Sequence, residues 1–446
     1  MEQKKYRNLT KLFFFKNLLF FTVISILGYS QDTIKVMHYN LMYYGKYFDD
    51  CTSSTNNIDT KNKNLKTIIK YAKPDIFSVN ELDGEAAYPQ ADDASYLLNN
   101  ALNVDGVDYY RKTETPTIYL ANIIFYNANK LILKTSQPIS FTYGGFQKIF
   151  NVYQFYFNSA DLSTNNDTAF IYFAVAHLKA GSNDLNQIQR AYETSLLMDY
   201  FESLGQAGNY IIMGDFNVYS PTEECFQNLI NPENSLYTFN DPADQIGEWA
   251  GNYNYRFVHT QSTHTYGDCF STGGMDDRFD FILASDYIMS GYNHYEYIEG
   301  TYKALGQDGS NFNGALRISG NSAVPSTVAQ ALYNMSDHLP VYMEIKVDQD
   351  LGEPLSAEEI ENSPQINISN PVSEELNIYM NLKQKTDLRI EIISLSGEKL
   401  FTEYYQQISG VFNPTISVSS LNQGLYIVNI LDGLKLIYTG KIVISR

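Results

Sequence analysis

Several apolar runs in this chain end in an amide, carboxylate or imidazole side chain. The runs IKVMHYN, DIFSVNE and FIYFAVAH end at Asn40, Glu81 and His177. Short runs rich in Ile, Val, Phe and Tyr and bounded by turn residues are typical of buried strands. In sheet proteins, ligands gather at the carboxyl ends of strands. We therefore expect these side chains to meet in one site that binds a cation and transfers protons.

Two further polar residues, Asp215 and Asn217, follow the run YIIMG. Because they are two positions apart, they point the same way in extended backbone, and Gly214 before them permits a close backbone approach. A carboxylate and an amide aimed at one point would hold a water molecule and a phosphate oxygen together. A turn satisfied by its own Asp and Asn side chains is the alternative interpretation.

Two histidines stand beside predicted strands. His177 ends one, and His338 follows Asp337 just before LPVYMEI. A single histidine at a strand edge is more often structural, but two of them among carboxylates favour proton transfer near neutral pH. Asp280, inside RFDFIL, is a candidate to hold one imidazole in a fixed tautomer.

The sequence lacks the motifs that are typical of two other kinds of hydrolase site. No GxSxG turn indicates a serine hydrolase, and no His/Cys cluster indicates zinc. The hard oxygen ligands suit Mg²⁺, with Mn²⁺ or Ca²⁺ as the other candidates. The three cysteines allow one disulfide and one free thiol, and the sequence leaves their pairing open.

The first 30 residues have the layout of a secretory signal peptide, a basic start followed by an apolar stretch and small residues. An uncleaved anchor is the alternative, and no other segment predicts a membrane span. Removal of this segment takes away one acidic and five basic residues, so the net charge changes from −19 to −23. Such a charge repels polyanions at long range and excludes a protein that wraps DNA electrostatically.

Two helices are predicted between the strands, and the composition then changes near residue 348. Residues 60–72 form the first helix. The second is capped by Ser182 or Asn183 and has Leu185, Ile188, Tyr192 and Leu196 at helical spacing. Residues 349–364 are acidic and contain proline, as linkers do. Short alternating strands with turn signals after them predict a small β-sandwich over 365–446.

The order of the candidate residues resembles the endonuclease/exonuclease/phosphatase superfamily, which includes DNase I-like nucleases. The resemblance covers about residues 33–347 and implies an α/β fold over 31–348, a four-layer α/β sandwich with two mixed β-sheets flanked by helices. It also implies that Glu81 is the main Mg²⁺ ligand, supported by Asn40 and Asp337. The sequence departs from the family at Asn80, where the residue before the metal ligand is commonly Gln.

By the same resemblance, Asp215 and Asn217 orient the attacking water and bind phosphate. His338, paired with Asp280, serves the in-line attack, and His177 interacts with the scissile phosphate. Lys179 and Arg278 lie within these motifs and are predicted to bind substrate. The carboxylate partner of His177 is left open.

The last 80 or so residues resemble the type A C-terminal sorting domain of the type IX secretion system. The matching pieces are NPVSEELNIYM, SLSGEKL, SLNQGLYIVNI and the terminal KIVISR. The resemblance implies handling by the type IX machinery and a secreted or cell-surface protein. A carbohydrate-binding or adhesive β-module is the alternative.

The leading hypothesis is a secreted, metal-dependent phosphodiesterase, an endonuclease that hydrolyses extracellular DNA or RNA. A phosphomonoesterase or a sphingomyelinase-like lipid phosphodiesterase on the same scaffold is the first alternative, and a catalytically silent surface adhesin is the second. A lipid enzyme would present exposed aromatic loops, for which the segment YNHYEY (292–297) is a candidate.

Overall fold

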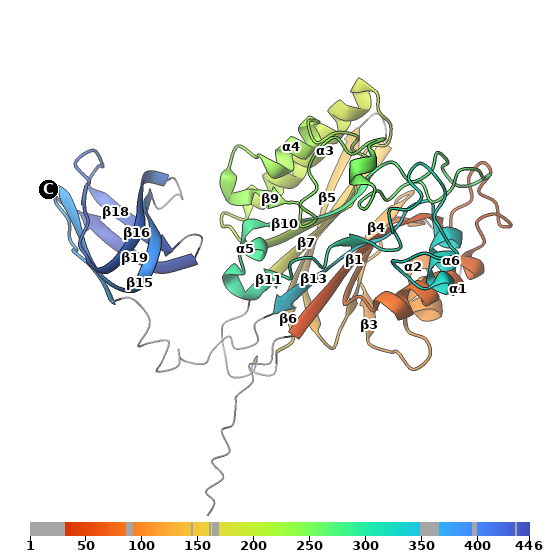
Figure 1. Ribbon diagram of the computed structural model, residues 1–446, viewed down its shortest axis with the longest axis horizontal. Helices are drawn as coiled ribbons and strands as arrows, with labels where there is room; N and C mark the ends of the chain where they lie inside the picture. Colours follow the sequence, from red (N-terminus) through yellow and green to blue (C-terminus); the bar gives the residue numbers. More distant parts are fainter. Residues whose placement is uncertain are drawn as a thin grey trace, which may run out of the picture.

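The computed structural model describes residues 32–85, 92–143, 146–159, 162, 169–347, 365–394, 399–432 and 435–446 (Figure 1). The predicted signal peptide and the predicted linker lie outside these residues. Among the helices of the described part, none combines the length and the apolar character needed to cross a bilayer.

The first sheet is mixed. Its strands are β1 (Asp32–Tyr44), β2 (Ile76–Leu82), β3 (Tyr110–Lys112), β4 (Ala121–Asn127), β11 (Tyr295–Tyr297), β12 (Lys303–Ala304) and β13 (Val341–Val347). They lie in the order β11-β13-β1-β2-β4-β3, and β12 also pairs with β13. β1 and β2 are parallel, whereas β13 runs antiparallel to β1.

The second sheet is also mixed. Its strands are β5 (Leu131–Tyr143), β6 (Phe146–Phe157), β7 (Phe170–His177), β8 (Asn209–Asp215), β9 (Phe239–Asn240) and β10 (Asp280–Ser285). Their order is β5-β6-β7-β8-β10-β9, with β7 and β8 parallel and β10 antiparallel to β8.

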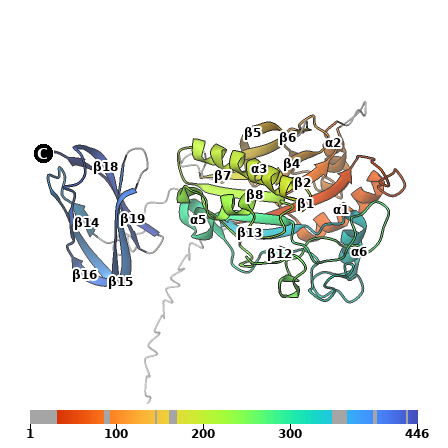
Figure 2. The same ribbon diagram turned by 90° about the horizontal axis from the view of Figure 1, so that it is seen from above.

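Three clusters of buried side chains define four layers (Figure 2). The middle cluster joins the inner faces of the two sheets, with Val36 and Ile76 from one and Phe173 and Ile211 from the other. A second cluster packs α1 (Ile58–Ala72), α2 (Asp93–Leu97) and α6 (Ser326–Met335) on the first sheet. The third packs α3 (Asp184–Ser203) and α4 (Glu224–Ile230) on the second sheet. The predicted four-layer α/β sandwich is confirmed.

Several short elements complete this unit. They are the α-helix α5 (Asp286–Met289), the π-helical turn η1 (Leu98–Leu102) and the 3₁₀ turns η2 (Ser235–Tyr237), η3 (Tyr253–Tyr255) and η4 (Tyr292–His294).

Helix α3 exposes the face that the sequence predicts to be apolar. Asn183 caps the helix as expected by accepting a hydrogen bond from the backbone N–H of Asn186. Leu185 and Ile188, however, are 73% and 56% exposed, whereas Arg190 and Glu193 are buried. The prediction of the face is wrong because the helix packs on the second sheet through Leu197, Met198 and Phe201 instead. Ion pairs satisfy the charges buried on the same side, Arg190 with Glu223 and Glu193 with Lys148.

The C-terminal residues form a separate all-β unit. Its strands are β14 (Gln365–Ile368), β15 (Glu375–Ser394), β16 (Lys399–Phe412), β17 (Thr415–Ser417), β18 (Gly424–Asp432) and β19 (Lys435–Ile444). The long strand β15 pairs with β14 and β17 through its first part and with β16 and β18 through its later part. Side chains from this unit alone form its core, including Leu376, Ile390 and Val428.

Candidate active site

Strand register brings the predicted residues to one edge of the two sheets. Asn40 lies beside Asn80 at the carboxyl ends of the parallel strands β1 and β2. In the other sheet, His177 lies beside Asp215 at the carboxyl ends of β7 and β8. Because β10 runs antiparallel to β8, its first residue, Asp280, pairs with Asp215.

Gly214 permits this close arrangement. A Cβ atom at this position would lie 1.8 Å from the backbone oxygen of Ala176 in the neighbouring strand β7. Any larger residue would push β8 away from β7 and separate Asp215 from His177. The glycine in GDFN therefore has the role that the sequence predicts for it.

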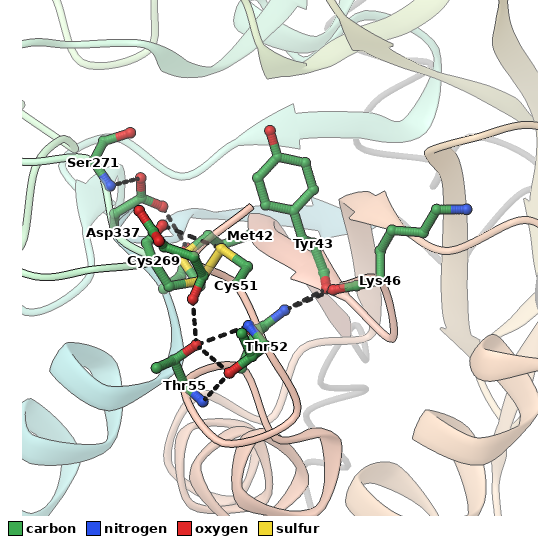
Figure 3. The surroundings of a disulfide bond; sticks show 12 residues. Met42, Tyr43, Lys46, Cys51, Thr52, Thr55, Cys269, Ser271 and Asp337 are labelled. Carbon is green, nitrogen blue, oxygen red and sulfur yellow. Dashed lines mark hydrogen bonds between the residues drawn. A yellow bond between two sulfur atoms is a disulfide. The ribbon is translucent and has the colours of Figure 1, made fainter. Parts of the chain in front are cut away.

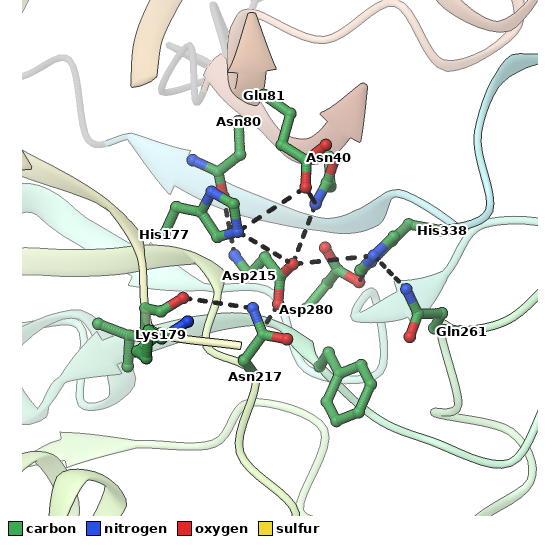
Figure 4. A network of polar contacts seen from close by, with 12 residues as sticks. Asn40, Asn80, Glu81, His177, Lys179, Asp215, Asn217, Gln261, Asp280 and His338 are labelled. Atoms are coloured by element: carbon green, nitrogen blue, oxygen red, sulfur yellow. Dashed lines mark hydrogen bonds and ion pairs between the residues drawn. The ribbon is translucent and has the colours of Figure 1, made fainter. Parts of the chain in front are cut away.

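One group of three side chains has the donor atoms and spacing of a metal site. Ligand atoms of Glu81, His177 and Asp215 lie within 4.8 Å of one another. His177 Nε2 is 3.8 Å from Glu81 Oε1 and 3.6 Å from Asp215 Oδ2 (Figure 4). Carboxylate oxygens with an imidazole nitrogen suit a divalent cation.

Asn40 joins the two carboxylates of this group. Its amide donates hydrogen bonds of 3.0 Å to Glu81 Oε1 and to Asp215 Oδ2, and its oxygen accepts from the backbone N–H of Met42. Glu81 is fixed further by the backbone N–H of Tyr43, which donates to Oε2 over 3.0 Å. The amide nitrogen of Asn40 thus faces the carboxylates while its oxygen is already used.

Asn80, where the sequence departs from the family pattern, links three strands. Its side-chain oxygen accepts a hydrogen bond from the backbone N–H of Asp215, and its amide donates to Asn122 in β4. The shorter amide therefore reaches across from one sheet to the other. It holds the end of β8 beside the end of β2.

His338 and Asp280 form the predicted pair. His338 Nδ1 lies 2.7 Å from Asp280 Oδ2, with both side chains buried. The other ring nitrogen, Nε2, is 3.7 Å from Asp215 Oδ2 and 2.6 Å from the side-chain amide of Gln261. One imidazole therefore connects Asp280 to Asp215 and, through it, to the group with metal-ligand spacing.

Asp337 faces a loop at the edge of this cluster. Its Oδ2 accepts a hydrogen bond of 3.0 Å from the backbone N–H of Ser271, and the Gln261 amide lies 3.4 Å away. Asp337 is not among the three residues with ligand spacing. Burial raises the pKa of Glu81, and the charge of Asp337 raises it further, so Asp337 contributes negative potential to the site.

Asn217 and Lys179 lie on the His177 side of the cluster. The backbone N–H of Asn217 donates to Asp215 Oδ1, and its side-chain amide donates to the backbone oxygen of Leu178. This bond holds the turn after β8 against the residues that follow β7. No hydrogen bond or ion pair joins the Lys179 ammonium to the residues that the structure describes.

Arg278 does not join the site, and its assignment as a substrate-binding residue needs correction. Its guanidinium is fully buried and donates to both carboxylate oxygens of Asp241, at 2.7 and 2.8 Å. The backbone oxygen of Gln245 and the Tyr302 hydroxyl accept further bonds. Because these partners occupy the charge inside the protein, Arg278 is unavailable to a substrate.

Burial and mutual charge shift the pKa values of the cluster. Burial raises the pKa of Asp215 to about 7 and that of Glu81 above its ordinary value. Burial, and then the charge of Lys148, lower the pKa of His177 well below its usual range. For His338, Asp280 and Asp215 outweigh burial and hold the pKa well above 6.5. A bound cation would favour the ionised form of both carboxylates and so offset the cost of burying two negative charges close together.

The sequence analysis missed two residues of the site. His38 is buried, with Nδ1 2.7 Å from Ser78 Oγ and Nε2 3.8 Å from Asp280 Oδ1. Its position two residues before Asn40 in a strand was a usable signal, because both side chains face the same way. Gln261 gave no such signal, since it comes from a long loop.

A disulfide joins the two loops beside Asp337 (Figure 3). Cys51, in the loop after β1, is bonded to Cys269, in the loop that carries Gln261 and Ser271. The remaining cysteine, Cys225, is free and buried. The disulfide therefore links segments that are 218 residues apart in the sequence.

Three solved structures are similar to the chain. The human Nocturnin catalytic domain with bound sulfate shares 16% identity, with 71% of this chain and 97% of that chain covered and a TM-score of 0.40. Humanized D. rerio TDP2 shares 14%, with 70% and 98% covered and a TM-score of 0.45. An endonuclease/exonuclease/phosphatase from Beutenbergia cavernae shares 13%, with 92% and 100% covered and a TM-score of 0.41. At this similarity, none of them assigns an activity to the chain.

The C-terminal unit matches a known family. No curated protein matches the chain. Residues 369–445, however, match the family described as Secretion system C-terminal sorting domain. The sequence pieces that predicted such a domain lie within this match. The C-terminal unit is a secretion sorting domain, and the chain is a secreted or cell-surface protein.

Proposed function

We propose that the chain is a metal-dependent phosphoric ester hydrolase that acts outside the cell, with residues 31–348 as its catalytic domain. The observation that supports this proposal is the group of Glu81, His177 and Asp215, with ligand atoms within 4.8 Å of one another. The buried pair of His338 and Asp280 adjoins it. Acid/base side chains next to a cation site match the needs of phosphoryl transfer to water.

Glu81 and Asp215 would hold a divalent cation, with Mg²⁺ the first candidate and Mn²⁺ or Ca²⁺ the others. At this position a cation would supply polarisation of a phosphoryl oxygen and neutralisation of the charge that develops on it. Asn40 would support this site by fixing both carboxylates, and Asp337 by its charge. The carboxylate oxygens of Glu81 and Asp215 are suitable donors for such a cation.

The remaining residues position water and protons. Asp215 and Asn217 would orient a water molecule for in-line attack on phosphorus, and His338, held by Asp280, would stabilise the attacking side. The new P–O bond comes from water as the bond to the leaving oxygen breaks. The proton released by water ends on the leaving alcohol. His177 lies on the side of the cluster away from His338 and would contact the scissile phosphate.

The test is hydrolysis by the purified protein of plasmid DNA, RNA, sphingomyelin, a phosphate monoester and bis(p-nitrophenyl) phosphate, with Mg²⁺ and with a chelator. Turnover that requires the metal is expected. Glu81→Ala and His338→Ala should each lower turnover by about 100-fold or more. Glu81→Ala should also weaken Mn²⁺ binding measured by calorimetry, which is a readout independent of turnover.

Glu296→Ala is the matched control. Glu296 is an exposed carboxylate on β11, which pairs with the end of β13 that lies beside the start of β1. It therefore lies at the opposite end of the sheet from the site. Unchanged hydrolysis in both Glu81→Ala and His338→Ala would mean that the active site lies elsewhere.

Nucleic acid is the substrate class that we place first, because export through the type IX machinery suits the use of extracellular DNA or RNA. A lipid phosphodiesterase is the second candidate, and one observation favours it. Leu185, Ile188 and Tyr192 form an exposed apolar stripe on α3, shortly after His177 in the chain. Release of phosphocholine from sphingomyelin vesicles, without cleavage of plasmid DNA, would favour it.

Two of the three tyrosines in the aromatic segment that the sequence offered for a lipid surface are buried. Tyr295 is fully buried and Tyr297 is 8% exposed, because β11 packs both rings between the sheets, whereas Tyr292 is half-buried. The segment therefore presents less aromatic surface than the lipid hypothesis expects. The stripe on α3 takes its place in the lipid hypothesis.

A further inference from the structure

A cavity of about 480 Å³ opens beside the candidate active site, and none of the roles above uses it. It shares His177 and Lys179 with the site, and its other walls include Tyr119, Tyr143 and Ile149. A cavity of this size accommodates a small organic group. Because His177 belongs to both, a group in the cavity would lie next to a phosphate bound at His177.

Part of the cavity wall is apolar. Phe150 and Ile118 line it and are buried in the protein. The cavity therefore offers apolar surface to a small group that enters it.

Two tyrosine rings form walls of the cavity, and each contacts a neighbouring side chain. The Lys46 ammonium lies 4.4 Å from the centre of the Tyr119 ring. The Tyr143 ring packs against Tyr192, with 6.0 Å between ring centres. Aromatic rings in a cavity wall favour contact with another flat ring, by offset stacking or edge-to-face packing.

A cation stands where the cavity meets the site. Lys148 is already used, because its ammonium lies 3.0 Å from Glu193 Oε1 and donates to the backbone oxygen of His177. The Lys179 ammonium has no such partner among the described residues. Its backbone is fixed, since its N–H donates to Glu193 and its carbonyl accepts from Arg190. A positioned, unpaired ammonium favours an anionic group at the mouth of the cavity.

We propose that this cavity, which we call the aryl pocket, binds a flat aromatic ring carried by the substrate's phosphate. The phosphate lies at Lys179 and His177, and the ring contacts Tyr119 and Tyr143. This inference rests on the proposed function and, among its phosphoester substrates, favours compact ones such as mononucleotide derivatives over the polymeric nucleic acid placed first above. The net charge of −19 agrees, because it repels a polyanion far more than a single phosphate.

Calorimetric titration tests the aryl pocket without any turnover. The ligands are adenosine 5′-monophosphate against ribose 5-phosphate, and phenyl phosphate against methyl phosphate, each in Ca²⁺ buffer. Adenosine 5′-monophosphate should bind about 10-fold or more tightly than ribose 5-phosphate. A ring preference in both pairs indicates any aryl group, and a preference in the nucleotide pair alone indicates a nucleobase. Equal affinities within both pairs would overturn the proposal.

Two substitutions test whether the preference for ring-bearing ligands arises in the aryl pocket. Ile149→Trp places an indole inside the pocket and should remove the preference for the ring while leaving ribose 5-phosphate binding unchanged. Leu236→Trp is the matched control, since Leu236 is an exposed leucine outside the pocket. If Ile149→Trp does not fold, as judged by its melting temperature, Tyr143→Leu replaces it and should reduce the preference. A full preference in a folded pocket variant would contradict the proposal.

The outcomes separate this inference from the proposed function. A ring preference without hydrolysis of any phosphoester would overturn the function and retain the pocket. Hydrolysis without a ring preference would do the reverse. Lys179→Met should weaken all four ligands by a similar factor, because it removes the charge and leaves the ring contacts.

Discussion

At His338 a single imidazole touches two carboxylates with different tasks. Asp280 Oδ2 lies 2.7 Å from Nδ1, whereas Asp215 Oδ2 lies 3.7 Å from Nε2. The first fixes the orientation of the ring, and the second belongs to the group with metal-ligand spacing. His38 lies on the other side of Asp280, so this carboxylate stands between two imidazoles.

Replacement of Asp280 by Asn should separate the two roles of this carboxylate, which are to orient the His338 ring and to stabilise its positive charge. Asn keeps the shape of the side chain but cannot stabilise a charged imidazole, so turnover should fall by roughly two to four orders of magnitude. Hydrolysis of bis(p-nitrophenyl) phosphate measures the loss. Unaltered turnover would show that His338 works without this partner.

Asp241→Asn is the natural comparison, because Asp241 is a buried carboxylate that serves a structural ion pair. The change leaves the buried Arg278 without its charged partner and should destabilise the fold by about 3–5 kcal/mol. Turnover per folded molecule should stay unchanged. Urea unfolding monitored by circular dichroism measures the first effect, and a specific loss of turnover would return Arg278 to the substrate site.

His264 makes stability depend on pH. Its ring is stacked between Phe270 and Tyr333, with ring centres 3.8 and 4.0 Å away. Burial lowers its pKa from 6.5 to about 4, and the charge of Asp337 offsets this only in part. As the pH falls below 6.5, the unfolded chain binds a proton that the folded protein takes up only near pH 4. Stability is therefore lost within this window, by at most about 3 kcal/mol.

His264→Phe should remove this contribution while keeping the stack. The difference in unfolding free energy between variant and wild type should grow as the pH is lowered from 7 to 4.5. Urea titrations at the two pH values measure it. A constant difference would show that His264 takes up its proton equally in both states.

At the scale of elements, loops complete what the strand ends begin. The strands supply Asn40, Glu81, His177 and Asp215, whereas the disulfide-tied loop supplies Gln261 to His338 and the Ser271 N–H to Asp337. Helix α3 carries both kinds of side chain on its buried side. Glu193 lies there together with Leu197 and Phe201, whereas Leu185 and Ile188 are exposed.

The double variant Cys51→Ser/Cys269→Ser tests the tie between the loops. Loss of a cross-link over 218 residues should cost roughly 2–5 kcal/mol of stability. Turnover should also fall, because the contacts to Asp337 and His338 come from the released loop. Thermal unfolding and hydrolysis assays measure both. Cys225→Ser, at the free buried thiol, is the control and should retain turnover.

At the scale of the whole molecule, two cores with no shared side chains serve two tasks. The side chains in the clusters of the α/β sandwich come from residues 34–347, and those in the C-terminal cluster come from residues 366–444. The candidate site draws only on the first unit. The second unit carries the match to the secretion sorting family.

A fragment of residues 31–347 should therefore retain turnover and unfold in one cooperative transition. In cells, the same truncation should prevent export, because it lacks the sorting domain. Activity assays on the purified fragment and blotting of culture supernatants measure the two effects. Secretion of the truncated chain at full yield would contradict a sorting role for the C-terminal unit.

The sequence by itself determined the two-unit organisation and the set of side chains at strand ends. These follow from local features, because apolar runs mark strands and turn residues mark where they stop. The resemblance to a nuclease superfamily supplied the four-layer sandwich and the expected roles of the site residues. The structure brings together Asn40, Glu81, His177, Asp215, Asp280 and His338 in one cluster.

Only the tertiary structure decided which charged side chains are buried and which apolar side chains of α3 are exposed. Arg278 and Lys179 look alike in the sequence, yet Arg278 is buried against Asp241, whereas the Lys179 ammonium lies beside a cavity without an ion-pair partner among the residues that the structure describes. Long-range ion pairs also keep Arg190 and Glu193 buried on α3, and Gln261 reaches the site from a loop fixed by a disulfide. Such outcomes depend on partners distant in the chain, which no local pattern of residues encodes.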